Sequence, residues 1–212
     1  MSTAQSTQQP PVIGLTGGIA SGKTTVSQRL AGLGAHIIDA DSVGHAVIAP
    51  QGEAYPEVVA AFGTEILDED GTISRKKLGA IIFADPARRA ELNGISHPRM
   101  AERMARDIEA VRLRQSGARP LAIVLDAAIL FEAGWDALCD TTWTVEAPEA
   151  LAIERLIARN AMTREEAQAR LAAQMNNAER ARRARHVIRN DGSLDALAEQ
   201  VQRLWEQTVR AR

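Results

Sequence analysis

The sequence predicts an α/β fold in which helices cover both faces of a five-stranded parallel sheet, giving a three-layer sandwich. Three observations support this prediction. Short apolar segments with strand character alternate along the chain with helical patterns. A glycine-rich loop stands directly between the first strand and the first helix. A long, mainly helical interval interrupts the alternation between the second and third strands. We therefore expect a sheet-containing core that carries a helical insert and a helical lid.

The five expected strands are apolar or β-branched runs. Val12–Leu15 precedes the glycine-rich loop, and the first helix should follow that loop from Gly22 to about Ala31. The run "LAIVLD", residues 121–126, is apolar enough to be covered on both faces. The remaining strands are "AHIID" at 35–39, "TTWTV" at 141–145 and "HVI" at 186–188.

Two helical stretches lie outside this alternation. The interval from Gly44 to Gly117 contains "DPARRAEL", residues 85–92, in which aspartate can cap a helix and proline suits its first position. The stretch from about Leu156 to Ala181 contains "TREE", residues 163–166, which has the spacing of a capping box. The polar residues 1–11 should form a disordered tail.

The composition excludes several classes of protein. The chain has 212 residues, and its 25 basic and 27 acidic side chains give a formal net charge of −2, which provides no general attraction to nucleic acid or to an anionic membrane. Cys139 is the one cysteine, so disulfide frameworks and cysteine-built metal sites are excluded. No apolar run approaches the roughly 18 residues of a membrane span. We expect a cytoplasmic protein, a monomer or a weak homo-oligomer, without nucleic-acid or membrane partners.

The segment "GGIASGKT", Gly17–Thr24, matches the pattern G-x-x-x-x-G-K-[ST] at every position. Glycines and small residues let backbone N–H groups converge on an anion, and the following helix directs its positive end to the same point. In this motif Lys23 would contact the outer phosphates and the Thr24 hydroxyl would help to hold Mg²⁺. We therefore predict a phosphate-binding loop (P-loop) and a fold of the P-loop NTPase type. A chance glycine-rich turn is the competing interpretation.

Aspartates follow two of the expected strands. In extended backbone Asp39 and Asp41 would point to the same side, at the carboxyl edge of the sheet beside the P-loop. A carboxylate there can orient or deprotonate an attacking hydroxyl, or hold Mg²⁺ through water, whereas the alternative is turn chemistry at a strand end. Asp126 follows the third strand, where it could face Mg²⁺ or cap a helix.

Arg155 and Arg159, in "AIERLIARN", are four residues apart and therefore share one face of a helix. Two guanidinium groups at the entry to a lid could neutralise charge on a phosphoryl group during its transfer. The alternative is a solvated basic face, paired with Glu154 or Glu165. The residues alone leave both interpretations open.

The order of the motifs resembles that of the dephospho-CoA kinases, from about Val12 to the C-terminus. The first motif is shared by many ATPases, whereas "DAD", followed by "HP" and "NDGS", is far more particular. The resemblance implies transfer of the γ-phosphoryl group of ATP to the ribose 3′-hydroxyl of dephospho-CoA, giving coenzyme A and ADP in the last step of coenzyme A biosynthesis. The motifs are "GLTGGIASGKTT", "IIDAD", "SHP", "VLDAAILFEAG", "ERLIARN", "TREEAQARLAAQ" and "VIRNDGS".

The resemblance also implies catalytic roles for four residues. Asp41 would be the catalytic carboxylate and Asp39 would support it. Lys23 and Arg155 would face the transferring group. The ATP site would comprise Gly18, Ala20, Ser21, Gly22, Lys23, Thr24, Thr25, Arg159 and Asn190.

The substrates and the metal follow from the same resemblance. His97, Asp41 and Asp126 would contact dephospho-CoA. Mg²⁺ would be held by Thr24, and by Asp39 or Asp126 through water. The expected organisation is a nucleotide-binding core at 12–43, 118–155 and 182–212, an insert for the CoA substrate at 44–117 and a lid at 156–181.

The chain departs from the usual family pattern at three places. Ala20 stands where the loop usually has glycine. Ala128 and Ile129 replace the usual proline and leucine after the third strand. Arg185 and Arg189 stand where acidic residues often flank the last strand. None of these changes the reaction class that the resemblance implies.

Three other interpretations also include a phosphate-binding loop. A nucleoside monophosphate kinase, or another small-molecule kinase, is disfavoured by the long insert. A regulatory GTPase would need an N-K-x-D motif, which the sequence lacks, and its "DEDG" (68–71) is far from any expected strand end. The basic run "ERARRARHVIR" (179–189) suggests a nucleic-acid-binding ATPase, but no aromatic residues interleave with it, so we expect a solvated helix face there, with some of its arginines touching ATP.

Overall fold

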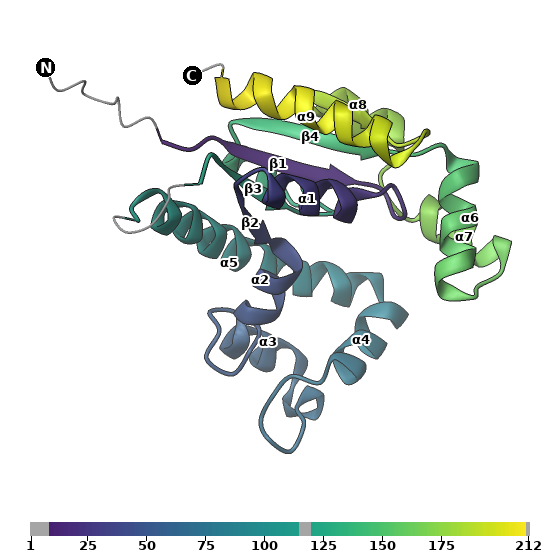
Figure 1. Ribbon diagram of the computed structural model, residues 1–212. Coiled ribbons are helices and arrows are strands. Elements are labelled where there is room, and N and C mark those ends of the chain that lie inside the picture. The colour runs from purple at the N-terminus through teal and green to yellow at the C-terminus, as the bar shows by residue number, and fades with distance from the viewer. Residues whose placement is uncertain (1–8, 115–119, 211–212) are drawn as a thin grey trace, which may run out of the picture. The chain divides into compact units, whose positions relative to one another are not determined.

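The computed structural model of the protein describes residues 9–114 and 120–210. The chain forms two compact units (Figure 1). The first unit holds the described residues up to Ile38 and from Ala110 onward, and the second unit is Asp39–Glu109. Among the described helices, none combines the length and the apolar character needed to cross a membrane.

The first unit is built on a five-stranded parallel sheet with the strand order β2-β3-β1-β4-β5, which confirms the predicted fold class. The central strand β1 pairs with β3 on one side and β4 on the other, and Leu15 lies opposite both Asp126 and Trp143. Asp126 is therefore level with the end of β1, where the P-loop begins. The strands are β1 (Val12–Gly17), β2 (Ala35–Asp39), β3 (Ala122–Asp126), β4 (Thr141–Glu146) and β5 (His186–Arg189).

Helices and turns cover both faces of this sheet. On one face, α1 (Lys23–Gly32) packs with α9 (Leu194–Arg210), and both contribute to an apolar core that contains Leu15 and Trp143 (Figure 1). On the opposite face, a Cβ atom at Gly14 would lie 2.8 Å from both Leu130 and Cys139, so the segment after β3 packs directly on the strand. That segment contains the 3-10 helix η2 (Trp135–Leu138).

The chain joins the sheet earlier than expected. Of the tail predicted at 1–11, residues 1–8 lie outside the described residues. Pro10 and Pro11 are buried, and the carbonyl oxygen of Pro11 accepts a hydrogen bond of 2.8 Å from the backbone N–H of Ile123. The backbone therefore pairs with β3 before the first strand begins.

A pair of helices follows β4. The helix α6 (Glu149–Asn160) begins before the predicted lid, and α7 (Arg164–Ala172) packs on it around the buried residues Leu156 and Ala167. The predicted capping box is present, because the backbone N–H of Thr163 donates to Glu166 Oε2 (2.8 Å) and the backbone N–H of Glu166 donates to Thr163 Oγ1 (3.2 Å). The short helix α8 (Asn177–Arg183) precedes β5.

The second unit is helical, as predicted for this interval, but it begins at Asp39 because α2 belongs to it. Gly44 of α2 lies against Met100 of α5, 3.2 Å from where a Cβ atom would stand. Asp85 caps α5 by accepting a hydrogen bond of 2.8 Å from the N–H of Ala87, as expected. The elements are α2 (Ala40–Val47), α3 (Tyr55–Phe62), η1 (Thr64–Ile66), α4 (Arg75–Ala84) and α5 (Pro86–Arg112), whose last residues enter the first unit.

Candidate active site

The P-loop joins the end of β1 to α1 in a tightly wrapped conformation. The N–H of Ser21 donates to the carbonyl oxygen of Gly18 (3.1 Å). Gly22, which precedes the helix, has a φ of 96°, and a Cβ atom there would lie 2.1 Å from Asn190 Nδ2. A Cβ atom at Gly17 would lie 2.8 Å from the carbonyl oxygen of Val145. The glycines at both ends of the loop are therefore required by backbone conformation or close packing.

Two side chains hold the outer surface of the loop. Asn190 Nδ2 donates to the carbonyl oxygen of Ser21 (2.8 Å), and Arg155 Nη1 donates to that of Ala20 (3.3 Å). Arg155 Nη2 also donates to Asn190 Oδ1 (3.4 Å). In a planar trans peptide the carbonyl and the following N–H point in opposite directions. Fixing the Ser21 carbonyl outward therefore turns the N–H of Gly22 to the inner side of the loop, where an anion would bind.

Lys23, the first residue of α1, contacts the carboxylate of Asp126 through its ammonium group. Both side chains are largely buried, with 20% and 11% of their surface exposed. The alternative that Asp126 caps a helix is wrong, because no helix begins before Trp135 in the segment that follows. Asp126 therefore holds the motif lysine at the mouth of the loop.

Ala20, where the family usually has glycine, takes a left-handed conformation with φ 58°. This costs an alanine about 1 kcal/mol relative to glycine. The side chains of Ile19 and Ala20 pack against the apolar cluster between α6 and α7, which includes Ile153 and Leu156. The methyl contact offsets part of the backbone strain.

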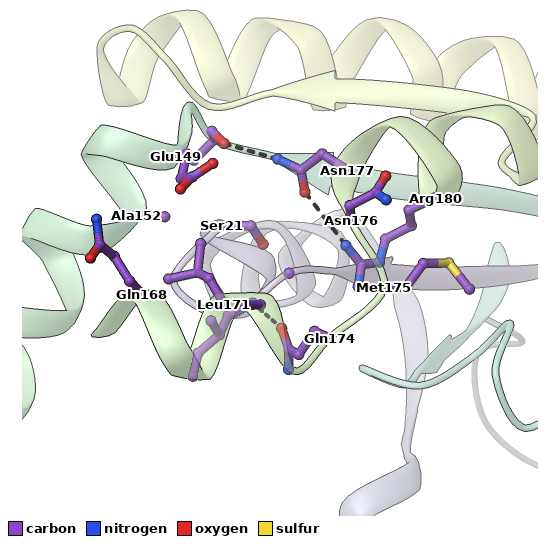
Figure 2. A pocket seen from close by; sticks show the side chains of 14 residues that line it. Ser21, Glu149, Ala152, Gln168, Leu171, Gln174, Met175, Asn176, Asn177 and Arg180 are labelled. Carbon is purple, nitrogen blue, oxygen red and sulfur yellow. Dashed lines mark hydrogen bonds between the residues drawn. The ribbon is translucent and has the colours of Figure 1, made fainter. Parts of the chain in front are cut away.

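A cavity of about 350 Å³ lies between the P-loop and the helices that follow β4 (Figure 2). Sequence reasoning missed three polar residues on its wall. Gln174 Oε1 accepts from the N–H of Ile19 (2.9 Å), Asn177 Nδ2 donates to the carbonyl oxygen of Ala147 (3.1 Å), and Arg180 Nη1 donates to Asn177 Oδ1 (3.4 Å). The cavity wall thus ties the loop to α7, α8 and the end of β4.

Arg180 corrects the expectation of a solvated helix face at 179–189. Only 1% of its side chain is exposed, and its guanidinium group lies 3.9 Å from Glu132. Burial lowers the pKa of Arg180, while Glu132 and then Glu146 act in the opposite direction. Burial likewise raises the pKa of Glu146. Asn176 caps α8 by accepting from the N–H of Glu179 (2.8 Å), but this marks the start of the helix and not the face that is buried.

Arg183 is exposed, with 38% of its side chain accessible, but its guanidinium group reaches the segment after β3. Its Nη2 donates to the carbonyl oxygen of Phe131 (3.0 Å), and its guanidinium group lies over the Phe131 ring at 4.8 Å. Since Arg180 and Arg183 are three residues apart on one helix, they share a side of α8. Arg182, between them, is 75% exposed.

The two strand-end aspartates lie in the second unit, in a conformation that differs from the predicted one. Asp39 is the N-cap of α2, accepting from the N–H of Asp41 (3.2 Å) and the hydroxyl of Ser42 (2.6 Å). Asp41 stands in the first turn of that helix, so the argument from extended backbone was wrong. Turn chemistry, the alternative considered for Asp39, is present, and the carboxylate of Asp41 is exposed.

Of the remaining predicted residues, Thr24, Thr25 and Arg159 lie in the first unit and His97 lies in the second. Thr24 and Thr25 are exposed in the first turn of α1, beside the loop. Arg159 is exposed and its Nε donates to the adjacent Asn160 (3.1 Å), so it shares α6 with Arg155 without sharing its contacts with the loop. His97 lies in the second unit, where burial lowers its pKa. Its helix continues through Pro98 to Arg112.

The described residues contain no cluster of three or more histidine, cysteine, aspartate or glutamate side chains arranged to hold a metal. The oxygen groups near the loop include the Thr24 hydroxyl and the Asp126 carboxylate. Mg²⁺ prefers such oxygen ligands, and it usually takes one or two from protein while nucleotide phosphates and water complete the shell. The residues present therefore fit a nucleotide-bound Mg²⁺ better than a permanent metal centre.

A P-loop at the end of the central strand of a five-stranded parallel sheet defines a nucleotide-binding protein with the fold of the P-loop kinases. Consistent with this, a shikimate kinase from Bacteroides thetaiotaomicron shares the fold, with a TM-score of 0.53 at 15% identity over 95% of this chain and 99% of that one. The family model described as Dephospho-CoA kinase matches residues 11–196. The chain belongs to the dephospho-CoA kinase family.

Individual relatives agree with this assignment. The chain is 45% identical to a dephospho-CoA kinase from Moorella thermoacetica over 200 residues, which cover 94% of this chain and 92% of the relative. It is 44% identical to one from Geobacter sulfurreducens over 194 residues, covering 92% and 96%. The solved structure of TT1252 from Thermus thermophilus matches with a TM-score of 0.76 at 30% identity, covering 94% and 98%. The predicted resemblance is confirmed, and the rival classes are set aside.

Proposed function

We propose that this protein transfers the γ-phosphoryl group of ATP to the ribose 3′-hydroxyl of dephospho-CoA, giving coenzyme A and ADP. Membership of the dephospho-CoA kinase family, over residues 11–196, carries the proposal. The braced P-loop supports it, because Asn190 holds the loop at Ser21 and Lys23 stands at the start of α1, where the positive end of the helix favours a phosphate.

In this proposal the P-loop binds the phosphates of ATP. The segment from Ala20 to Thr25 surrounds the β-phosphate with backbone N–H groups, other than that of Ser21, which donates to Gly18, and the positive end of α1 points toward it. Lys23 exchanges part of its contact with Asp126 for the phosphate oxygens. Asn190 acts through the carbonyl of Ser21, fixing the loop beside the nucleotide.

Mg²⁺ bound with ATP would neutralise charge on the phosphate oxygens, and Thr24 would hold it, with Asp126 or Asp39 contributing through water. Asp126 also keeps the lysine oriented when phosphate is released, because the two groups already touch.

The acceptor side of the proposal rests on the family's pattern. Asp41 orients the 3′-hydroxyl and takes its proton late in the reaction, supported by Asp39, whose carboxylate caps the helix that carries Asp41. His97, in the second unit, contacts dephospho-CoA. Arg155 stabilises the charge of the transferring group.

The domain roles follow from these assignments. Residues 12–43, 118–155 and 182–212 form the nucleotide-binding core, residues 44–117 bind the CoA substrate, and residues 156–181 form a lid that excludes water from the reaction. We propose that the protein acts in the cytoplasm as a monomer or a weak homo-oligomer, which sedimentation over a concentration series would test.

An acceptor screen tests the function. Purified protein is incubated with ATP and Mg²⁺ plus dephospho-CoA, AMP, CMP, shikimate or no acceptor, and ADP release is followed. ADP should appear with dephospho-CoA alone, and phosphorus NMR of the product should place the new phosphate on the 3′ position. ADP formation that ignores dephospho-CoA would overturn the proposal.

A variant pair tests the proposed base. Asp41→Asn should lower turnover by at least about 100-fold, because it removes the group that contacts the reacting hydroxyl. Asp68→Asn is the matched control, since Asp68 is a half-exposed aspartate of the same unit that pairs with Lys77. Near-normal turnover by Asp41→Asn would remove Asp41 from catalysis without affecting the assignment of the substrate.

A further inference from the structure

The P-loop is joined to the helices that follow β4 through its backbone. Gln174 stands just after the end of α7 and its Oε1 accepts a hydrogen bond of 2.9 Å from the N–H of Ile19 (Figure 2). Ile19 lies in the variable part of the loop, between Gly18 and Ala20. A side chain 155 positions away in the sequence therefore fixes one of the loop's own N–H groups.

The loop is also joined to the same helices through its side chains. Ile19 and Ala20 pack against the cluster formed by Ile153, Leu156 and Ala167 of α6 and α7. Ala20 keeps a left-handed backbone that alanine adopts at a cost, so its contact with the cluster helps to hold the loop in this shape. The same short stretch of the loop is thus bound by one polar and one apolar attachment.

The connection from α7 to α8 is fixed on its far side as well. Asn177 Nδ2 donates to the carbonyl oxygen of Ala147, and a Cβ atom at Gly18 would lie 3.4 Å from Arg180 Nη1. The cavity of about 350 Å³ separates the loop from much of this wall. Because the two surfaces are not packed together over that space, the bond from Ile19 to Gln174 is a direct polar link between them, beside the apolar contacts of Ile19 and Ala20.

We propose that Gln174 is a positioning residue that links the conformation of the P-loop to the docking of α7 and α8. This inference rests on the proposed function, because it takes the nucleotide as the ligand of the loop. If phosphate binding favours the loop shape in which the N–H of Ile19 meets Gln174, then it must also favour docked α7 and α8. Linkage makes the effect reciprocal, so loosening the helices must weaken nucleotide binding by the same factor.

The test compares two glutamines on the wall of the same cavity. Gln174→Met keeps the side-chain length and volume but removes the acceptor. Gln168→Met is the control, because Gln168 is an exposed residue of α7 whose amide, among the described residues, makes no hydrogen bond with the loop. Gln174→Asn, which keeps an amide but shortens its reach, provides a second variant. Thermal melting followed by circular dichroism establishes that each variant is folded.

The readout is hydrogen exchange over residues 164–183, with and without saturating ADP, together with the dissociation constant for ADP. In the unaltered protein ADP should slow exchange in this segment. Both Gln174 variants should lose most of that protection and bind ADP about ten-fold more weakly, which is the upper scale for one intramolecular hydrogen bond. Gln168→Met should behave like the unaltered protein.

The outcomes separate this inference from the function on which it rests. Failure of the unaltered protein to bind ADP would overturn both. Normal ADP affinity and normal protection in the Gln174 variants would overturn the linkage and leave the kinase function intact. A lower melting temperature with unchanged ADP-dependent protection would show a purely structural role, and it too would overturn the inference.

Discussion

Asn190 Nδ2 donates a hydrogen bond of 2.8 Å to the carbonyl oxygen of Ser21, from a position 169 residues further along the chain. The amide is buried, and its oxygen accepts a second hydrogen bond from Arg155. Asn190 therefore uses both ends of its amide to support the P-loop. The closing "NDGS" motif acts on the same site as the opening glycine motif.

Asn190→Asp should weaken nucleotide binding. The variant is nearly isosteric but replaces the donor with a carboxylate oxygen that faces a carbonyl oxygen. Leaving a buried acceptor unpaired costs about 1–3 kcal/mol, so the dissociation constant for ADP should rise roughly 10- to 100-fold. Calorimetric titration measures it, with Asn160→Asp on the exposed end of α6 as the control. Unchanged affinity would mean that the loop does not depend on this bond.

Lys23→Met should lower turnover by at least about 100-fold, because it removes a cation that faces the transferring phosphoryl group. Asp126→Asn leaves the lysine in place but without its carboxylate partner. We expect a smaller loss of turnover and a weaker response to Mg²⁺ in this second variant. A coupled ADP assay over a Mg²⁺ series checks both; an identical Mg²⁺ dependence in Asp126→Asn would exclude Asp126 from the metal site.

Ala20→Gly should be close to neutral. Glycine relieves about 1 kcal/mol of left-handed strain, but it loses a methyl contact worth about 0.8 kcal/mol. Ala20→Val should be strongly destabilising to the loop, since a β-branched residue rarely adopts a φ of 58°. The KM for ATP and the melting temperature of the two variants report the difference. A harmless valine would contradict the strained conformation.

Arg155→Ala should lower kcat more than it raises the KM for dephospho-CoA, because the guanidinium group is assigned to the transferring group. It should also weaken ADP binding, since Arg155 holds the carbonyl of Ala20. Arg203→Ala, at an exposed site of α9, is the control for removing one positive charge. A change confined to the KM for dephospho-CoA would reassign Arg155 to acceptor binding.

Cys139 should be unreactive in the folded protein. Burial, followed by the nearby Asp136 and Asp140, raises the pKa of its thiol to about 12 from 9.0. The thiolate is the reactive form, so at pH 8 its fraction falls roughly 1000-fold. Reaction with a disulfide reagent should be at least about 100-fold slower than after unfolding in urea. Above pH 9.0 the thiol ionises in the unfolded chain while it stays protonated in the folded protein. The free energy of unfolding therefore falls as the pH rises above 9.0.

The fold could be predicted because, in the core, each local sequence pattern favours the same strand or helix that the packed sheet requires. The glycine motif requires a strand before it and a helix after it, and the apolar run at 121–126 has the character of a covered strand. The sequence predicted extended backbone for Asp39 and Asp41, but the helix α2 begins at Ala40, directly after β2. An aspartate at the end of a strand can cap a helix or form a turn, and Asp39 caps α2. Three residues are too few for a periodic pattern to distinguish a helix start from a turn.

Arg180 and Gln174 were missed for a different reason. In sequence, Arg180 is one of several arginines in a basic run, and burial of a single member depends on what the rest of the fold places around it. Gln174 contacts the loop through one side-chain oxygen, a relationship that spacing cannot reveal. Local sequence predicted the phosphate-binding motif, whereas the residues that brace it are defined by tertiary packing.

The support given to Ser21 by Asn190 has a consequence for the order in which the protein matures. A ribosome releases the glycine motif before it releases Asn190, 169 residues after Ser21, and the helix α9, whose Leu197, Val201 and Trp205 complete the core beside α1. A nascent chain stopped before Asn190 would display the whole motif without its brace. The loop therefore reaches its full affinity for nucleotide only after Asn190 has been synthesised and has folded against Ser21.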